Sequence, residues 1–556
     1  MTEKGRSGRS ASALVALGIM FSRVSGLVRE AVFGAFLGVG GAADAFTMAT
    51  RVPNVLQMLL GEGTLSASFI PVYSSELERD EEEAGRIAGA VAALLALVAA
   101  TIVIFSWIFA PQIAGIMGRG FTDEGRALTT TLMRIIFPSA GMLVLSAWCL
   151  GILNSHRQFF LSYVAPVLWN IAQIGAVVGA ALFFGVADVA DGVDLSDPDA
   201  NVGALGDIAT VAAWGFFVGS ALQFLVQVPN VRKLTTGLKI RLDLKRKGLR
   251  QVVSRFGGAV LGRGVIQISA LMDTFLAGLL VTGAVTALGK AQVLYILPIS
   301  LFAVSIAAAE LPVLSRLTDL DEIRDRAQAG FQRITFFVAF TSLAYVLLGD
   351  KIVGTLYERG QFNSDDTLLI WFALGAYALG LLPSALSRLS QNALWSQGDT
   401  AGPARVALVR VVIAIAIAAG VMRWFDQIGT ADIRDALPTL YDRGELNTEL
   451  RIGAAGITFG SAVAAWVEAI LLWFMARDAV PGISPLRPLK PLLPSIAAAA
   501  VVAILFRFGT DDLWPPLAAL LSVGFAGLAY VGVAWLRGVE ETNLVLVGPL
   551  KRYRIQ

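Results

Sequence analysis

The stretch that decides the fold begins FSRVSGLVREAVFGAFLG at residues 21–38 and continues as GAADAFTMATRVPNVLQMLLGEGTLSASFIPVY at residues 41–73. It holds two hydrophobic segments joined by a glycine-rich turn. Both segments carry charge within or beside the apolar run, at Arg23, Arg29, Glu30, Asp44, Arg51 and Glu62. An ionisable group at membrane depth costs roughly 2.5–3.5 kcal/mol on insertion scales and usually faces a bundle interior or a water-filled cavity. The stretch therefore predicts two membrane helices with a polar, functional face.

Composition places the whole chain among polytopic α-helical membrane proteins. Of its 556 residues, 56% are hydrophobic and 15% are charged, and the mean hydropathy is +0.69. Apolar runs of about 20 residues, the length that spans a bilayer as a helix, recur along it. The net charge of +2 says little by itself, and no nucleic-acid partner is expected. The single cysteine, Cys149, and the single histidine, His156, lack companions for a disulfide or a metal site, so we expect both to be structural.

Fourteen apolar segments are predicted to cross the membrane. They are residues 13–37, 42–72, 89–109, 128–152, 161–184, 210–228, 253–281, 291–313, 334–348, 368–393, 406–421, 452–476, 492–506 and 516–536. An even number places both termini on one side of the membrane. More than half of the 44 lysines and arginines fall in the N-terminal tail and in every second loop, above all in loop 229–252. The positive-inside rule assigns these parts, and both termini, to the cytoplasm.

The chain also contains an internal repeat. SFIPVYS at 68–74 is echoed by AELPVLS at 309–315, and LNSH at 153–156 by LWSQ at 394–397. Both echoes share one offset, since 312 − 71 = 241 and 394 − 153 = 241. This predicts two six-helix lobes in parallel repeat, a transporter plan with the substrate between the lobes. The predicted domains are an N-terminal lobe at 1–228, a basic cytoplasmic linker at 229–252, a C-terminal lobe at 253–476, and a C-terminal helix pair with its tail at 477–556.

Helical spacing gathers the charged residues into stripes. In the first segment Arg23 and Glu30 are seven residues apart and share a face with Gly26, while Arg29 points about 120° away. The second segment has polar or sulfur-containing side chains at three- and four-residue steps, at Arg51, Asn54, Met58 and Glu62. In the seventh segment Arg263 and Asp273 are ten residues apart, roughly on one face. We expect this set to line a cationic cavity, although pairing that merely holds the bundle together is the alternative for any single residue.

The predicted ligand of this cavity is an anion, in particular a phosphate or diphosphate, because the arginine fork donates two hydrogen bonds to such groups. No ATPase is visible. The nearest phosphate-loop match, GAVTALGKA at 283–291, has the wrong spacing and lacks Ser or Thr after Lys290. No Ser-His-Asp or zinc pattern is present either, so we expect a transporter rather than an enzyme, with no cofactor. Coupling to the membrane potential or to a monovalent ion is expected to drive it.

Several motifs in the chain resemble those of the MurJ/MviN family of lipid II flippases, within the multidrug/oligosaccharidyl-lipid/polysaccharide exporter superfamily. The matching stretches are FSRVSGLVRE at 21–30, DAF at 44–46, RVPN at 51–54, EG at 62–63, FIPV at 69–72, YERGQF at 357–362 and GAAGIT at 453–458. The resemblance implies a central cationic cavity, a last helix pair bordering a groove for the lipid tail, and alternating access in a bacterial inner membrane. It implies lipid II as the cargo, with membrane lipids and the cell-wall synthesis machinery as further partners.

The charged stripes and the family resemblance together predict two groups of site residues. Those expected to contact substrate are Arg23, Arg29, Asp44, Arg51, Asn54, Gln57, Glu62 and Arg263. Those expected to support or gate the site are Ser22, Gly26, Glu30, Asp273 and Lys290.

The sequence departs from the family pattern at two positions where the family commonly carries an arginine. Here these positions hold Gln57 and Val293. Our hypothesis is that Arg51, Arg263 or Lys290 compensates for the missing charge. The alternatives are a different lipid-linked oligosaccharide as cargo, a cation-coupled exporter of the same superfamily, and a non-transporting scaffold for cell-wall assembly. An exporter of that kind would have a cavity dominated by carboxylates, whereas this one is rich in arginine.

Overall fold

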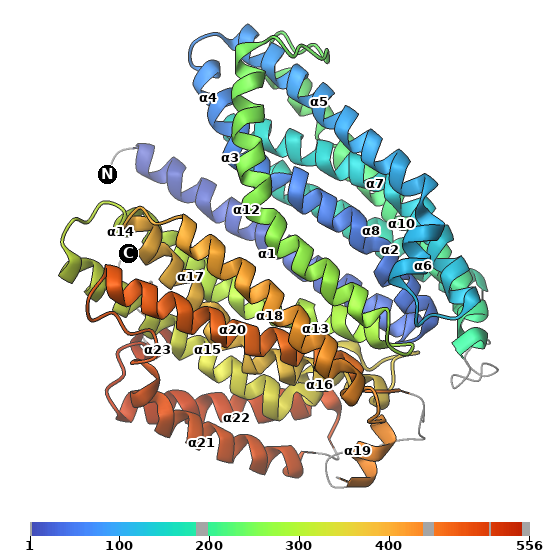
Figure 1. The fold of residues 1–556 in the computed structure, drawn as a ribbon, viewed down its shortest axis with the longest axis vertical. Helices are drawn as coiled ribbons and strands as arrows, with labels where there is room; N and C mark the ends of the chain where they lie inside the picture. The colour runs from blue at the N-terminus through green and yellow to red at the C-terminus, as the bar shows by residue number, and fades with distance from the viewer. Residues whose placement is uncertain (1–2, 185–197, 437–449, 511–512, 547–556) are drawn as a thin grey trace. The chain divides into compact units, whose positions relative to one another are not determined.

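The computed structural model describes residues 3–184, 198–436, 450–510 and 513–546. In these ranges all regular structure is helical except for an isolated bridge between Gly429 and Arg451. The chain divides into two compact units (Figure 1). Unit 1 comprises residues 1–286 together with 359–362, and unit 2 comprises residues 287–358 and 363–556.

Unit 1 is built around the helices of the first repeat. Its helices are α1 (Glu3–Leu37), α2 (Gly41–Leu60), α3 (Glu62–Ser68), α4 (Ile70–Leu77), α5 (Glu81–Ile108), α6 (Ala110–Met117), α7 (Asp123–Ser155), α8 (Phe159–Phe184), α10 (Pro198–Leu225), α11 (Val228–Leu234) and α12 (Lys247–Ala277). Gly61 separates α2 from α3, where the chain leaves helical geometry. Around α5 and α7 the core buries large side chains such as Phe69, Tyr73 and Trp148, together with Cys149.

Unit 2 holds the second repeat except for α12, together with the last helix pair. Its elements are α13 (Ala284–Pro298, which starts in unit 1), the π-helix η1 (Ile299–Val304), α14 (Ser305–Leu314), α15 (Leu320–Tyr357), α16 (Ser364–Leu379), α17 (Leu381–Ser396), α18 (Ala401–Phe425), α19 (Thr430–Ala436), α20 (Gly453–Ala479), α21 (Leu489–Gly509), α22 (Pro515–Leu536) and α23 (Thr542–Leu546). Helices α21 and α22 pack on α15 through an apolar cluster that includes Phe336 and Tyr530.

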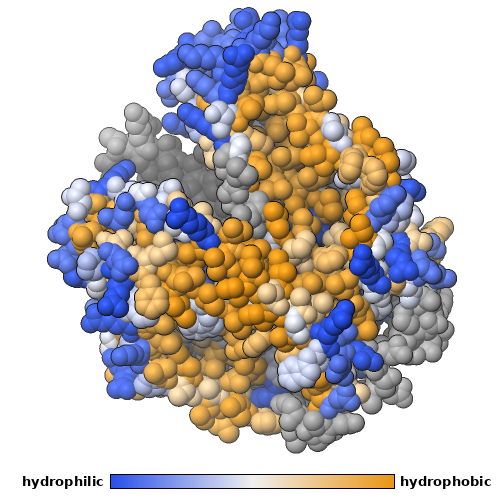
Figure 2. Space-filling model, viewed as in Figure 1, coloured by the Kyte–Doolittle hydropathy of each residue, from blue (hydrophilic) through white to orange (hydrophobic). Residues whose placement is uncertain are grey.

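The chain is a multi-pass membrane protein with an all-α fold, as predicted. In the described ranges twelve helical stretches are long and apolar enough to cross a membrane. Helices α1 and α12 coincide with two further predicted segments, but part of their side chains lies outside the described residues, so the count of fourteen stays a prediction. In unit 1, hydrophilic side chains gather at the end where α4 meets α5, and hydrophobic side chains cover the helices beyond it (Figure 2).

The helix bounds repeat with the offset found in the sequence. Helix α7 spans Asp123–Ser155, and α16 with α17 spans Ser364–Ser396, so both ends differ by 241 (364 − 123 and 396 − 155). Helices α8 and α18 end at Phe184 and Phe425, again 241 apart. The contact-based grouping nevertheless keeps α12 in unit 1, beyond residue 228 where the predicted N-terminal lobe ends. The predicted lobe boundaries therefore stay a prediction.

The basic linker, residues 229–252, packs against α5. A Cβ added at Gly85 would lie 1.9 Å from the Thr236 carbonyl oxygen, and one at Gly89 would lie 2.0 Å from that of Lys239. Glycine at these two positions lets the linker backbone touch the helix. Arg246 pairs with Glu83, and the hydrogen bond to that carboxylate raises the pKa of the guanidinium above its usual value.

Candidate functional site

The first polar feature of unit 1 is a network between α1 and α8. Arg29 donates from Nη2 to Glu30 Oε1 at 2.6 Å and from Nη1 to Asn170 Oδ1 at 3.2 Å. Its guanidinium lies 4.8 Å from the centre of the Trp169 ring. Asn170 in turn donates to Ser25 Oγ at 2.9 Å. These contacts fix the orientation of the Arg29 fork.

The neighbouring residues of α1 are more open. Arg23 is exposed, Ser22 and Gly26 are half-buried, and a Cβ at Gly26 would lie 3.9 Å from Asn170 Nδ2. Arg23 makes no hydrogen bond or ion pair with any residue that the structure describes. The predicted shared face of Arg23 and Glu30 thus does not make them partners, because Glu30 pairs with Arg29.

Helix α2 carries the second polar feature. Arg51 is half-buried and donates from Nη2 to the Ala270 carbonyl of α12 at 2.9 Å. Further along the helix, Asn54 and Gln57 are half-buried and Met58 is 54% exposed. The predicted stripe on α2 therefore runs from a contact with α12 out to the accessible surface.

The side chain of Asp44 is buried and caps the start of α13. It is 0% exposed. Its Oδ2 accepts from the Gly283 N–H at 2.7 Å, and its Oδ1 accepts from the Thr286 N–H at 2.7 Å and the Thr286 hydroxyl at 2.6 Å. The carboxylate thus sits at the N-terminus of α13, where unpaired N–H groups favour a negative charge. Asp44 thus ties α2 to the first residues of α13, and its predicted contact with substrate stays a prediction.

The remaining predicted residues divide into three groups. Asp273 of α12 is buried, at 7% exposure. Glu62 begins α3 and Arg263 lies within α12, but their side chains fall outside the described residues. Lys290 belongs to unit 2, is 6% exposed, and places its Nζ 4.6 Å from the centre of the Tyr357 ring. All predicted site residues except Lys290 thus lie in unit 1, and among them Arg29 and Glu30 form an ion pair.

Unit 2 has a charged cluster of its own that the sequence analysis did not single out as a site. Glu468 of α20 accepts from Arg410 at 2.5 Å and from Gln391 at 3.3 Å. Arg388 lies one turn from Gln391 on α17 and is half-buried. These residues come from three separate helices, so no local pattern links them. Intraspan charge was the one signal that could have found them.

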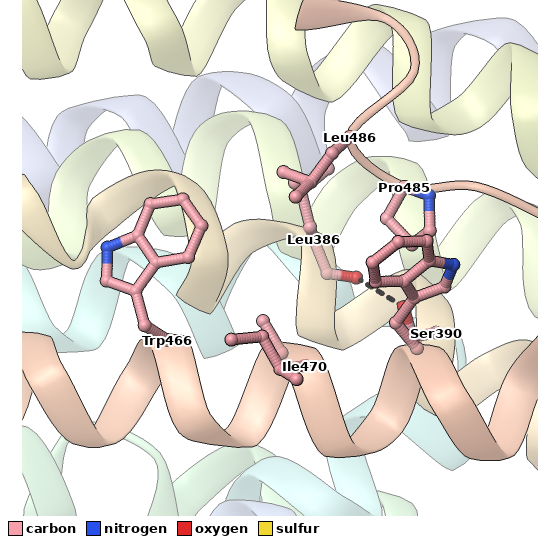
Figure 3. A pocket seen from close by; sticks show the side chains of 8 residues that line it. Leu386, Ser390, Trp466, Ile470, Pro485 and Leu486 are labelled. Atoms are coloured by element: carbon pink, nitrogen blue, oxygen red, sulfur yellow. Dashed lines mark hydrogen bonds between the residues drawn. The ribbon is translucent and has the colours of Figure 1, made fainter.

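An apolar crevice lies between residues of α17, of α20 and of the loop that follows α20 (Figure 3). Trp466, Ile470 and Trp473 of α20 line it, together with Leu386 of α17 and the loop residues Pro485 and Leu486. Both indole N–H groups are satisfied elsewhere, Trp466 by the Leu379 carbonyl and Trp473 by that of Ile483. Ser390 also lines the crevice, and its hydroxyl donates to the Leu386 carbonyl at 3.2 Å. The rest of the lining is hydrocarbon, and the tryptophans offer it no free donor.

The arrangement in unit 1 suits an anionic ligand. An exposed guanidinium at Arg23 and an oriented one at Arg29 lie six residues apart on one helix, and a third arginine stands on α2. Arginine binds phosphate oxygens through paired donors, and its charge persists at any physiological pH. The geometry is that of a binding surface and not of a reaction centre.

Comparisons with known proteins agree with this description. The family model described as "Lipid II flippase MurJ" matches residues 33–433. A protein of Bdellovibrio bacteriovorus named "Probable lipid II flippase MurJ" is 26% identical over 546 residues, which is 96% of this chain and 95% of that protein. One of Burkholderia cenocepacia named "Lipid II flippase MurJ" is 28% identical over 404 residues, which is 71% of this chain and 74% of its own length.

Solved structures show the same fold. One described as "Lipid II flippase MurJ, inward closed conformation" has a TM-score of 0.73 at 23% identity, covering 94% of this chain and 98% of that chain. An inward-facing multidrug resistance MATE family transporter of the MOP superfamily has a TM-score of 0.62 at 16% identity, covering 85% of this chain and 98% of that chain. At these identities the two likenesses establish the architecture alone.

Proposed function

Because the chain belongs to the lipid II flippase MurJ family, we propose that it carries lipid II from the inner to the outer leaflet of a bacterial cytoplasmic membrane. The cargo would be an undecaprenyl-diphosphate-linked disaccharide-pentapeptide, moved by alternating access, with both termini of the protein in the cytoplasm. Relatives matched over most of their length are named "Lipid II flippase MurJ" or "Probable lipid II flippase MurJ".

The observation that best supports an anionic cargo is the state of the two arginines on α1. Arg29 is held by Glu30, Asn170 and Trp169, so its fork is oriented before any ligand arrives. Arg23 is exposed and makes no hydrogen bond or ion pair with the described residues. A diphosphate offers several acceptor oxygens, to which either guanidinium can donate paired hydrogen bonds.

Depletion of the protein tests this proposal. Loss should accumulate lipid II in the inner leaflet and lyse the cells, and an established lipid II flippase should restore growth. An unchanged distribution of lipid II between the leaflets would contradict the proposal and favour a scaffold or a different cargo.

Variants on α1 test the role of the arginines. Arg23→Gln and Arg29→Gln should each lower transport strongly, and Arg29→Lys should not restore it because an ammonium lacks the planar fork. Arg126→Gln is a matched control, since Arg126 pairs with Asp123 at the start of α7 and away from α1. Full activity of both α1 variants would contradict the cationic site.

Compensation for the two missing family arginines is part of the proposal. Arg51, Arg263 and Lys290 are the cations offered in place of arginine at Gln57 and Val293. Single alanine variants of each, assayed for transport, address this point. Full activity of all three would end the hypothesis.

A second candidate cargo is another lipid-linked oligosaccharide, and the departures at Gln57 and Val293 are the observation that favours it. Purified protein should then bind or flip that lipid in preference to lipid II in a competition assay. If lipid II competes best, the second candidate fails.

A further inference from the structure

Helix α15 is broken close to its C-terminal end. Leu348 leaves helical geometry, with φ −126° and ψ 15°. The next residue, Gly349, faces the ring of Trp371 on α16, and a Cβ there would lie 2.4 Å from Trp371 Cδ1. Glycine at 349 therefore lets the indole pack directly against the backbone at the break.

Side chains from two other helices cap the carbonyl groups that precede the break. Trp371 Nε1 lies 3.2 Å from both the Tyr345 and the Val346 carbonyl oxygens. Arg507 of α21 donates from Nη1 to the Leu347 carbonyl at 2.6 Å. In an unbroken helix such carbonyls serve the N–H groups four residues on. Side-chain donors on three successive carbonyls mark the place where the ladder opens.

Arg507 also contacts a carboxylate and an aromatic ring at the break. The same Nη1 lies 2.9 Å from Asp350 Oδ1, and the guanidinium stands 4.6 Å from the centre of the Trp371 ring. The side chains of Arg507 and Asp350 are 6% and 5% exposed. Nη2 of Arg507 is buried with no hydrogen-bond partner in the described residues.

These ligands match those of a monovalent cation site. Carbonyl oxygens of an interrupted membrane helix, with a carboxylate beside them, are the groups with which transporters bind coupling cations. Here the chain supplies the cation itself, from a helix that follows the two repeats. Lys351, buried at 9% exposure, is the other charged residue beside Asp350 in sequence.

We propose that the guanidinium of Arg507 occupies a cation-binding site at the break in α15. Through this contact, the packing of α21 against α15 stabilises the bend in α15. The C-terminal helix pair then restricts movement of α15, a helix of the second repeat, about its break. This role goes beyond cargo binding, because it concerns a joint within unit 2 that no cargo needs to reach.

Chemical rescue tests the cation site directly. In Arg507→Ala the melting temperature of the purified full-length protein should fall. Millimolar guanidinium chloride should restore more than half of that loss with saturation, whereas equal sodium chloride should not. The double variant Arg507→Ala/Asp350→Asn should show no such rescue. A matched control is Arg333→Ala, because Arg333 lies on α15 ahead of the break and its side chain is 44% exposed.

Absence of a saturable guanidinium effect in Arg507→Ala would overturn the proposal. If that variant does not accumulate, Arg507→Lys serves instead, since it keeps the charge but loses the fork. Amide hydrogen exchange should then rise at residues 346–351 and stay unchanged in the first half of α15. Unchanged exchange at 346–351 would equally overturn the proposal.

Discussion

Two carboxylates of unit 1 show how position decides the role of one functional group. Glu30 lies partly exposed and balances Arg29 on the same helix. Asp44 is fully buried and accepts three hydrogen bonds from residues 283–286. The first orients a partly buried cation, whereas the second joins α2 to the start of α13. Sequence spacing places both in the same polar stretch and does not separate these roles.

Replacing Asp44 by asparagine should destabilise the protein. The amide would direct its NH₂ group at one of the N–H donors that the carboxylate now accepts. Each buried donor left unpaired costs about 1–3 kcal/mol. Thermal unfolding of Asp44→Asn in detergent should show this loss. Thr286→Val, which removes only the hydroxyl donor, should lose less; equal stability of Asp44→Asn and the parent protein would contradict the assignment of Asp44 as a joint.

At the scale of elements, the contact between α5 and the basic linker depends on two glycines. Gly85→Ala or Gly89→Ala would place a methyl group about 2 Å from a carbonyl oxygen of the linker. We expect either change to push residues 235–246 off the helix and to expose them to protease. Gly175→Ala on α8 is the control, because a Cβ there meets nothing within 4 Å. That change should be neutral or stabilise the helix by up to about 1 kcal/mol. Equal proteolysis of the two sets would contradict the linker contact.

The joint between α4 and α7 should respond to pH through His156. His156 follows the last residue of α7, and its Nε2 lies 2.9 Å from the hydroxyl of Tyr73 on α4. Burial lowers the pKa of His156 below 6.5, although Glu81 opposes the shift. The unfolded chain therefore binds more protons than the folded protein once the pH falls through about 6.5, and stability should decrease there.

Unfolding of the wild type and of His156→Gln, compared on both sides of that pH, isolates the effect. The wild type should lose stability relative to the variant at the lower pH. The loss should be small, because the ring is only half-buried and its pKa is therefore lowered only in part. A larger acid-induced loss in His156→Gln would contradict the sign.

At the scale of the whole molecule, the hydrophobic runs and the 241-residue offset predicted the helical class and the repeat. The sequence predicted the bounds of the helices less well, since α15 extends over Leu320–Tyr357 whereas the apolar pattern marked only 334–348. Charged residues at a helix end, such as Asp321 and Glu322 in the first turn of α15, interrupt the apolar pattern from which a membrane span is predicted. The joint of Arg507 with Asp350 was missed because its two residues lie 157 positions apart. Long-range pairs of this kind leave no periodic trace in one sequence.

The direction of transport should depend on the membrane potential. A diphosphate with two negative charges that moves outward across an inside-negative membrane gains up to about 4–5 kcal/mol at about 100 mV, from about 2.3 kcal/mol per charge. Proteoliposomes with a potential set by potassium and valinomycin should therefore flip the cargo faster toward the positive side. Collapsing the potential should remove the bias, and reversing it should reverse the bias. A rate that ignores both the size and the sign of the potential would mean that the moving complex carries no net charge, so that another ion gradient must drive the cycle.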